Sequence, residues 1–356
     1  MAASIEPRIH QALRRGLVIP ACPLALNSER QIDTRRQRGL IRYYTAAGVG
    51  GLAVGVHTTQ FAIRDPRHSL FQPLLELTAE ELDRAPRPDS NPLVRIGGVT
   101  GTTAQATSEA ALLRDLGYHA GLLSLGALAK AGEEELLAHC RTVAEIIPII
   151  GFYLQPAAGG RVLPYSFWRR VADLENLVAI KIAPFNRYQT IDVMRAIAEA
   201  GRDDIALYTG NDDNLVIDLL TPFRFHVEGR IIERRIVGGL LGHWAVWTRK
   251  AVELHAEIRE LTNSGAPISA ELLRRNVEIT DANGAFFDAA HDFAGCIPGI
   301  HEVLRRQGLL EGIWCLNPKE TLSPGQREEI ERVCRSYPHL ADDDFVASHL
   351  DQWLTS

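Results

Sequence analysis

Cysteine is scarce in this chain of 356 residues, and no two cysteines have the C-x-x-C spacing of a zinc site. The five cysteines are odd in number and widely separated, which argues against a disulfide framework. The twelve histidines form no H-x-x-x-H motif and no carboxylate-flanked cluster. We therefore expect neither a catalytic metal nor any other cofactor.

Long hydrophobic runs and an excess of positive charge are also missing. No apolar run reaches transmembrane length, and the N-terminus lacks the charged-then-apolar pattern of a signal peptide. The formal net charge of −6 lacks the basic surplus that non-specific nucleic-acid binding requires. Two arginine-rich stretches, Arg35–Arg38 and Arg230–Arg235, are interpreted as solvated faces or substrate-side charges. These absences predict a cytoplasmic protein that binds neither nucleic acid nor membrane.

The chain does contain a regular alternation of short apolar runs, rich in β-branched residues, with longer amphipathic stretches. Eight such runs, spaced at about one βα unit each, predict a closed (β/α)8 TIM barrel rather than an open sheet. The runs are expected to end at Ala21, Val56, Gly97, Ser124, Tyr153, Lys181, Tyr208 and Leu241.

Helices are expected in the stretches between these runs, where apolar residues recur every three or four positions. Thr78–Glu81 has the sequence of a capping box and predicts the start of a helix. Extra residues around Phe223–Ile236 predict an insertion between the seventh and eighth strands. The four clearest helical stretches are Ser108–Leu116, Glu133–Ile147, Tyr165–Leu174 and Ile191–Ala200.

From about Ala245 onward the pattern is helical only. It predicts a barrel over residues 1–244 and a C-terminal helical appendage, packed on the barrel, over residues 245–356. Ser323–Gln326 has the cap, the N1 proline and the box partner of a helix start. The helices expected here are Ala245–Leu261, Ser269–Ala290, Gly299–Gln307 and Ser323–Tyr337.

Lys181 ends the sixth apolar run, and the functional groups of such barrels come from the C-terminal ends of strands. Burying an ammonium group without a partner is costly, so burial lowers the pKa of a lysine towards neutrality. A neutral amine can attack a carbonyl and form a Schiff base. The alternative is a lysine that pairs with Asp or Glu or reaches solvent, and this stretch alone leaves both possibilities open.

Other polar residues also follow strand ends. Tyr153 lies 28 residues before Lys181, on the neighbouring strand, where a phenol beside an iminium can act as general acid and base. A strand-end tyrosine taken alone is more often structural. Thr58 and Thr59 follow the second run, where their hydroxyl and backbone N–H groups could hold a carboxylate and relay a proton.

Three further candidates for substrate binding are weaker. Asn211 lies in Thr209–Asp213 after the seventh run, which either lines the pocket mouth or forms an ordinary turn. His57 and His243 each come directly after a strand and either contact substrate or are satisfied core histidines.

These residues together resemble the dihydrodipicolinate synthase/N-acetylneuraminate lyase family, over essentially the whole chain. The resemblance rests on Tyr153-Leu-Gln-Pro156, the 28-residue step to Lys181, the Thr58–Thr59 pair and Thr209-Gly-Asn-Asp-Asp213. It implies a barrel with a helical tail, usually tetrameric, whose lysine forms an imine with a 2-keto acid such as pyruvate. Carried onto this sequence, it implies that Lys181 is the nucleophile and Tyr153 the acid/base. It also implies that Thr58 binds the substrate carboxylate and that Thr59 relays a proton.

Several family motifs are altered in this chain. The family's Gly-Thr-Thr-Gly-Glu appears as His57-Thr-Thr-Gln-Phe61, and its Pro-Tyr-Tyr appears as Ala127-Leu-Ala129. The arginine that follows the tyrosine in dihydrodipicolinate synthases is absent, and Arg161 or Arg187 is the candidate replacement for binding an anion. Dihydrodipicolinate synthesis itself is therefore not expected.

The sequence thus predicts a Schiff-base-forming lyase or aldolase that acts on a pyruvate-type 2-keto acid. We expect a homo-oligomer, either a dimer or a tetramer, with each active site built mainly within one chain. Two alternatives remain: a 2-keto-3-deoxy sugar acid dehydratase that uses the same imine, and a non-catalytic ligand-binding protein. Retention of both Tyr153 and Lys181 favours an enzyme.

Overall fold

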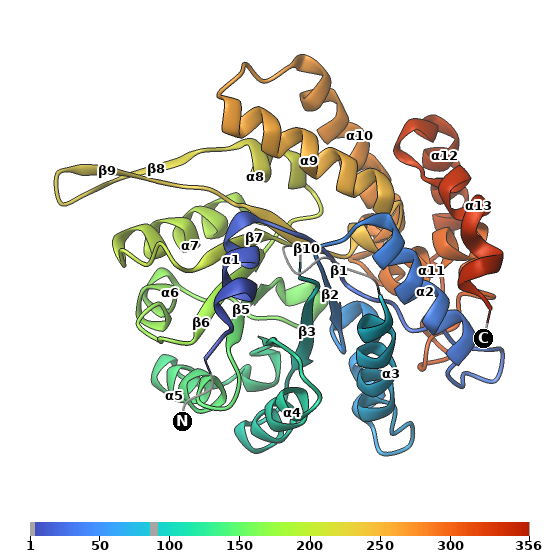
Figure 1. Ribbon diagram of the computed structural model, residues 1–356, viewed down its shortest axis with the longest axis horizontal. Helices are drawn as coiled ribbons and strands as arrows, with labels where there is room; N and C mark the ends of the chain where they lie inside the picture. The colour runs from blue at the N-terminus through green and yellow to red at the C-terminus, as the bar shows by residue number, and fades with distance from the viewer. Residues whose placement is uncertain (1–3, 86–91, 356) are drawn as a thin grey trace.

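A closed parallel barrel forms the centre of the computed structural model, which describes residues 4–85 and 92–355 (Figure 1). The sheet order is β1-β10-β7-β6-β5-β4-β3-β2, and a bridge between Ala21 and Ala53 joins β1 to β2. The predicted barrel is thereby confirmed. Its strands are β1 (Val18–Pro20), β2 (Gly51–Val54), β3 (Val94–Val99), β4 (Ala120–Leu123), β5 (Ile149–Leu154), β6 (Leu177–Ala183), β7 (Ala206–Thr209) and β10 (Gly238–Leu241).

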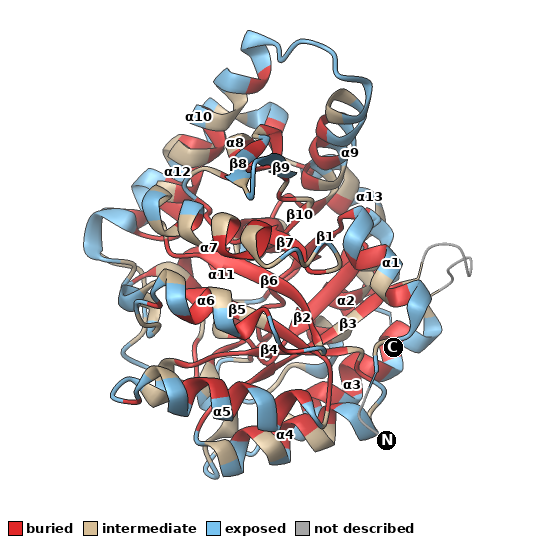
Figure 2. Ribbon diagram, turned by 90° about the vertical axis from the view of Figure 1, so that its left-hand side faces the viewer, coloured by how far each residue is buried: buried red, intermediate tan, exposed pale blue. Residues whose placement is uncertain are grey.

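Helices surround this barrel, and Figure 2 shows them buried on one face and exposed on the other. The four interstrand helices predicted from periodicity are present as α4 to α7, with bounds shifted by a few residues. The helices of the barrel region are α1 (Pro7–Arg15), α2 (Thr34–Ala47), α3 (Phe71–Arg84), α4 (Thr103–Asp115), α5 (Glu133–Ala144), α6 (Tyr165–Val171), α7 (Arg187–Glu199) and α8 (Leu215–Leu220). Short 3-10 turns are η1 (His57–Thr59), η2 (Phe61–Arg64), η3 (Gly126–Leu128), η4 (Pro156–Ala158), η5 (His243–Ala245), η6 (Ala289–His291) and η7 (Pro338–Leu340).

Successive side chains of a strand point to opposite faces, and this alternation divides the core into two apolar clusters. Phe152, Ala179 and Ala183 belong to the cluster inside the barrel, together with Ile9 and Leu13 of α1. A larger cluster, which includes Tyr153, Ile180 and Ile182, lies between the strands and the helices. The side of the strand that a residue faces therefore decides whether it reaches the barrel interior.

The predicted insertion before the last strand is an antiparallel hairpin of β8 (Phe223–Val227) and β9 (Arg230–Arg234). It extends away from the barrel in Figure 1.

The C-terminal region is helical, as predicted, and contains α9 (Thr248–Ser264), α10 (Ala270–Phe286), α11 (Cys296–Arg306), α12 (Gln326–Ser336) and α13 (Asp343–Trp353). The sequence analysis did not identify α13. At the start of α12, Gln326 Oε1 accepts the backbone N–H of Ser323 at 3.0 Å, but the Ser323 hydroxyl donates to Asp288, and the N-cap of the helix is Gly325, which has no side chain to cap it. Among the described residues, no helix is both long and apolar enough to span a membrane.

The capping box predicted at Thr78–Glu81 is wrong. Thr78 lies inside α3, which begins at Phe71, and its hydroxyl donates to the carbonyl of Leu74 at 2.8 Å. A threonine inside a helix can bond to the preceding turn in this way, and its sequence context does not distinguish that from a cap.

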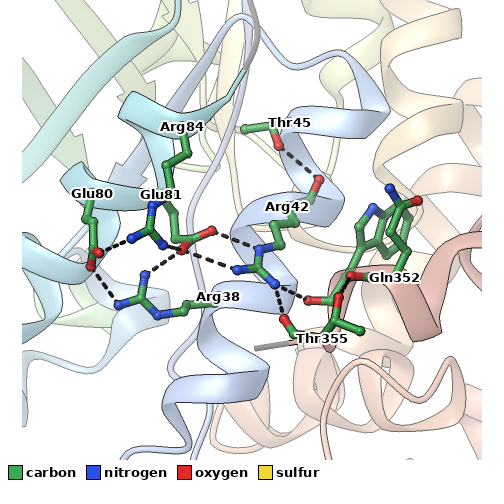
Figure 3. A network of polar contacts seen from close by, with 9 residues as sticks. Arg38, Arg42, Thr45, Glu80, Glu81, Arg84, Gln352 and Thr355 are labelled. Carbon is green, nitrogen blue, oxygen red and sulfur yellow. Dashed lines mark hydrogen bonds and ion pairs between the residues drawn. The ribbon is translucent and has the colours of Figure 1, made fainter.

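The first arginine-rich stretch is solvated only in part, at Arg35, and its side chains bind other parts of the fold rather than a substrate. Arg35 Nε donates to the carbonyl of Leu354 at 2.8 Å, and Arg36 donates to the carbonyl of Gly308 at 2.6 Å. Arg38 binds the buried carboxylate of Glu81 on α3 (Figure 3). Arg35 and Arg36 of α2 therefore bind the C-terminal region, and Arg38 binds α3.

Candidate active site

Lys181 lies on β6, a strand whose residues are all buried. Its neighbours on the same face are Ala179 and Ala183, which belong to the interior cluster, so its side chain points into the barrel. It lines a cavity of about 90 Å3 at the C-terminal end of the strands. This is the end of the barrel where the sequence predicted the functional groups.

The environment of Lys181 is apolar on most sides. The side chain is 8% exposed, and its Nζ lies 4.5 Å from the centre of the Phe152 ring. Within residues 4–85 and 92–355 no carboxylate forms an ion pair with it. Burial lowers the pKa of Lys181, and the negative charge of Asp212 opposes part of that change. Of the two interpretations that the sequence left open, the geometry supports an unpaired amine.

Gly210, directly after β7, provides the space that the Lys181 side chain occupies. A Cβ at this position would lie 2.7 Å from Lys181 Cε and 2.7 Å from the Cβ of Ala183. Any larger residue would push the lysine away from its present position.

Phenylalanines form much of the cavity wall. Phe152 comes from β5 and Phe185 from the loop after β6, whereas Phe287 and Phe293 come from the segment between α10 and α11. The rings of Phe185 and Phe293 meet edge to face, with centroids 5.6 Å apart. Residues of the C-terminal region therefore complete a cavity that the barrel strands begin. These rings were not predicted, because no local sequence pattern indicates which phenylalanines come together in the fold.

The polar side chains on the cavity wall include His57 and Thr58, which open η1, and Asp212, which follows β7. Burial and the charge of Lys181 lower the pKa of His57 to about 4, so the ring is neutral at pH 7. The Asp212 carboxylate accepts the backbone N–H of His243 at 2.9 Å, and burial raises its pKa. The sequence left open whether Thr209–Asp213 lines the pocket mouth or forms an ordinary turn, and the candidate selected from it was Asn211 rather than Asp212.

The prediction that Tyr153 lies beside Lys181 is not met by the geometry. Phe152, not Tyr153, pairs in register with Lys181, so the tyrosine faces the helices. Its ring packs against Trp168 with centroids 5.4 Å apart, and its hydroxyl accepts the backbone N–H of Leu163 at 3.2 Å. The 28-residue spacing correctly predicted neighbouring strands, but it does not determine which face each side chain occupies.

The two threonines differ in position. Thr58 lines the cavity, whereas Thr59 is fully buried beside it and makes hydrogen bonds within the protein. The Thr59 hydroxyl donates to the carbonyl of Cys22 at 2.7 Å and accepts the backbone N–H of Val56 at 3.2 Å. Thr59 thus fixes the turn that presents Thr58 and His57.

The remaining predicted substrate-binding side chains lie outside this cavity. Arg161 donates to the carbonyls of Leu128 and Ala131, and Arg187 pairs with Asp218.

Asn211 and His243 also bind other parts of the protein. The Asn211 amide donates to Asp218 at 3.0 Å and to Thr190 at 3.2 Å. The His243 ring stacks on Phe286, and only its backbone N–H reaches Asp212. Asn211 is thus occupied by polar partners inside the fold and the His243 ring by an aromatic one, and the sequence gives no sign of these partners.

Comparison with known proteins is consistent with this arrangement. The model of the dihydrodipicolinate synthetase family matches residues 15–221. The 4-hydroxy-tetrahydrodipicolinate synthase of Desulforamulus reducens is 24% identical over 282 residues, which cover 72% of this chain and 86% of that protein.

Two solved structures share the fold. One is the chloride-inhibited dihydrodipicolinate synthase from Acinetobacter baumannii complexed with pyruvate, with a TM-score of 0.72, 16% identity and coverage of 91% of this chain and 99% of that one. The other is N-acetylneuraminate lyase from Fusobacterium nucleatum, with a TM-score of 0.68, 17% identity and coverage of 91% and 99%. Because the family match spans more than half of its residues, the chain belongs to the dihydrodipicolinate synthetase family.

Proposed function

We propose that this protein is a lyase or aldolase that forms a Schiff base between Lys181 and a pyruvate-type 2-keto acid. The observation that carries the proposal is a buried lysine, without an ion pair in the described parts of the chain, that points into a cavity at the catalytic end of a barrel. Membership of a family whose relatives include a pyruvate complex supports the same chemistry.

In the proposed reaction, the neutral Lys181 amine attacks the keto carbon, and loss of water gives an imine. The apolar wall favours the neutral amine because it disfavours the ammonium ion. The Thr58 hydroxyl is positioned to bind the substrate carboxylate, and Thr59 holds the turn that carries it. The protonated imine then withdraws electrons from the adjacent carbon–carbon bond, which makes cleavage or formation of that bond possible.

The cavity wall also bears on the choice of substrate. Four phenylalanines, with Val56 and Leu154, outnumber the polar side chains of His57, Thr58, Gln155 and Asp212, so a chain of hydroxyl groups would find few hydrogen-bonding partners. Leaving such hydroxyl groups unpaired would be costly, at roughly 1–3 kcal/mol each. This favours a short or apolar 2-keto acid over a 2-keto-3-deoxy sugar acid, and therefore a lyase or aldolase over the alternative dehydratase.

Borohydride trapping tests the proposal. The protein is incubated with a panel of 2-keto acids, treated with borohydride and digested with trypsin. Because a modified lysine resists trypsin, the label should appear on the peptide of residues 171–187. Lys181→Ala should abolish labelling and turnover. Lys250→Ala is the matched control, since Lys250 is exposed and pairs with Glu253 at 2.9 Å, and it should change neither.

Three outcomes separate the possibilities. Label on Lys181 with carbon–carbon cleavage supports the proposal. Label without turnover of any adduct supports the binding-protein alternative, and turnover that survives Lys181→Ala excludes the Schiff-base mechanism.

A further inference from the structure

The cavity needs a group that moves protons, and Tyr153 does not reach it. Among the described residues, the titratable side chains that line the cavity are His57, Lys181, Asp212 and Cys296. The pKa of His57 is lowered to about 4, mainly by burial, so its ring is a weak base. Burial raises the pKa of the Cys296 thiol, which therefore stays protonated. Neither group is suited to accept and return a proton near pH 7.

Asp212 is held so that one carboxylate oxygen is occupied and the other is available. Oδ1 accepts the backbone N–H of His243 at 2.9 Å, and the backbone carbonyl of Asp212 accepts the Asn283 amide at 2.7 Å. No hydrogen bond to Oδ2 occurs within the described parts of the chain. The side chain is 8% exposed and lines the same cavity as Lys181. The His243 backbone thus fixes the carboxylate and the Asn283 side chain fixes the Asp212 backbone, while Asp212 and the reacting lysine line the same cavity.

We propose that Asp212 is the residue that transfers protons to and from the Lys181-bound substrate. This inference rests on the Schiff-base function proposed above. In the cleavage direction, Asp212 takes the proton from the hydroxyl on C4 of the bound adduct. The electron pair of that O–H bond forms the aldehyde C=O, and the C3–C4 pair moves into a C2–C3 double bond. The imine nitrogen accepts the displaced π pair, which gives an enamine, and Asp212 then delivers its proton to C3.

Electrostatics supports this assignment. Burial raises the pKa of Asp212 and lowers that of Lys181, so the two groups approach each other in proton affinity. A general acid–base group works best when its pKa lies near the working pH. An ionised Asp212 would also stabilise the positive charge of the protonated imine, since opposite charges attract strongly in a buried site.

The test uses pyruvate alone, so it does not require knowledge of the natural aldehyde. In D2O the wild type should exchange the methyl protons of pyruvate for deuterium, which NMR detects, because enamine formation removes a proton from C3. Asp212→Asn keeps an acceptor for the His243 N–H but cannot take up the proton. We expect it to retain borohydride labelling of Lys181 by pyruvate and to lose exchange by about 10²–10⁴-fold.

Asp213→Asn is the matched control, because Asp213 is adjacent and exposed but does not line the cavity. It should exchange like the wild type. Asp212→Ser, whose hydroxyl can also accept the His243 N–H, provides the comparison if the asparagine variant does not fold. Exchange at the wild-type rate in a labelled Asp212 variant would overturn this proposal alone. A wild type that no 2-keto acid labels would overturn both proposals.

Discussion

At the scale of single residues, Tyr153 shows how little separates a catalytic position from a structural one. Its neighbour Phe152 faces Lys181, and a register shift of β5 by one residue would exchange the two rings. The pairing of β5 with β6 contains an irregularity between Ile149 and Ile150, which spacing along the chain cannot reveal. Sequence analysis could therefore locate Lys181, His57 and Thr58 at the cavity, but it could not determine which aromatic ring faced the lysine.

The Tyr153→Phe variant tests this orientation. Removing the hydroxyl leaves the buried Leu163 N–H without its acceptor, which should lower the free energy of unfolding by about 1–3 kcal/mol. Borohydride labelling of Lys181 should remain, because the tyrosine does not face the cavity. Urea unfolding and peptide mass spectrometry measure the two effects. Loss of labelling at an unchanged free energy of unfolding would instead indicate that Tyr153 acts in the active site.

The pH dependence of trapping tests the environment of Lys181. Only the neutral amine attacks a carbonyl, so the trapping rate should rise with pH as Lys181 loses its proton. Because burial lowers the pKa of Lys181, this rise should occur below the ordinary lysine value of about 10.4. The label on the exposed Lys130 and Lys319 in the same digest measures trapping outside the cavity. A rise at the ordinary value would contradict the buried, unpaired amine.

At the scale of elements, the α2–α3 pair anchors the C-terminus through Glu81. Its carboxylate binds Arg38, Arg42 at 2.9 Å and Arg84 at 2.9 Å (Figure 3). Arg42 also donates to the carbonyl of Trp353, at the end of α13, at 2.9 Å. One acid on α3 therefore connects three arginines and the last helix.

Glu81→Gln should lower the free energy of unfolding by about 1–3 kcal/mol. This loss of stability is smaller than that expected when a fully buried ion pair is broken, because the arginines are partly exposed. Burial raises the pKa of Glu81, but Arg42 and Arg38 outweigh it and leave the pKa lowered. The stabilisation is therefore present above the ordinary Glu pKa of about 4.3 and is lost as pH falls through the folded value. Glu80→Gln is the comparison in acid unfolding curves, because it removes only the exposed partner of Arg38 and Arg84 and should cost less.

The elements themselves followed largely from periodicity. The eight strand ends, to within two residues, and four of the C-terminal helices were predictable because the short strands recur at near-regular spacing and the helices have apolar residues every three or four positions. The exceptions are α13, which begins soon after Pro338, and Thr78, whose sequence context resembles a helix cap. Arg35 and Arg36 looked solvated because their partners are backbone carbonyls hundreds of residues away, which no local pattern encodes.

At the scale of the whole molecule, the division into a barrel over 1–244 and an appendage over 245–356 remains a prediction. The cavity draws Phe287, Phe293 and Cys296 from the second part, so a chain ending at residue 244 would lack part of its wall.

We also expect a homo-oligomer, either a dimer or a tetramer, in which each chain carries its own cavity. The molar mass measured by light scattering at micromolar concentration should therefore exceed the 39.3 kDa of one chain. Borohydride labelling should reach one keto acid per chain whatever the assembly state. A monomer would contradict the first expectation, and labelling of half the chains at saturation would contradict the second.

The closure of the barrel has a further consequence. Among the described residues, β1 and β2 are joined by a single bridge, with hydrogen bonds from Cys22 N–H to Ala53 and from Gly50 N–H to Val18. By contrast, β5 and β6 pair from Ile149 and Leu177 through to Leu154 and Ala183. Local opening begins where few backbone bonds must break, so the seam at β1 should admit solvent before the wall that carries Lys181. The amide of Cys22 should then exchange its hydrogen faster than those of β6, and we expect Lys181 to lie on the side of the barrel that opens later.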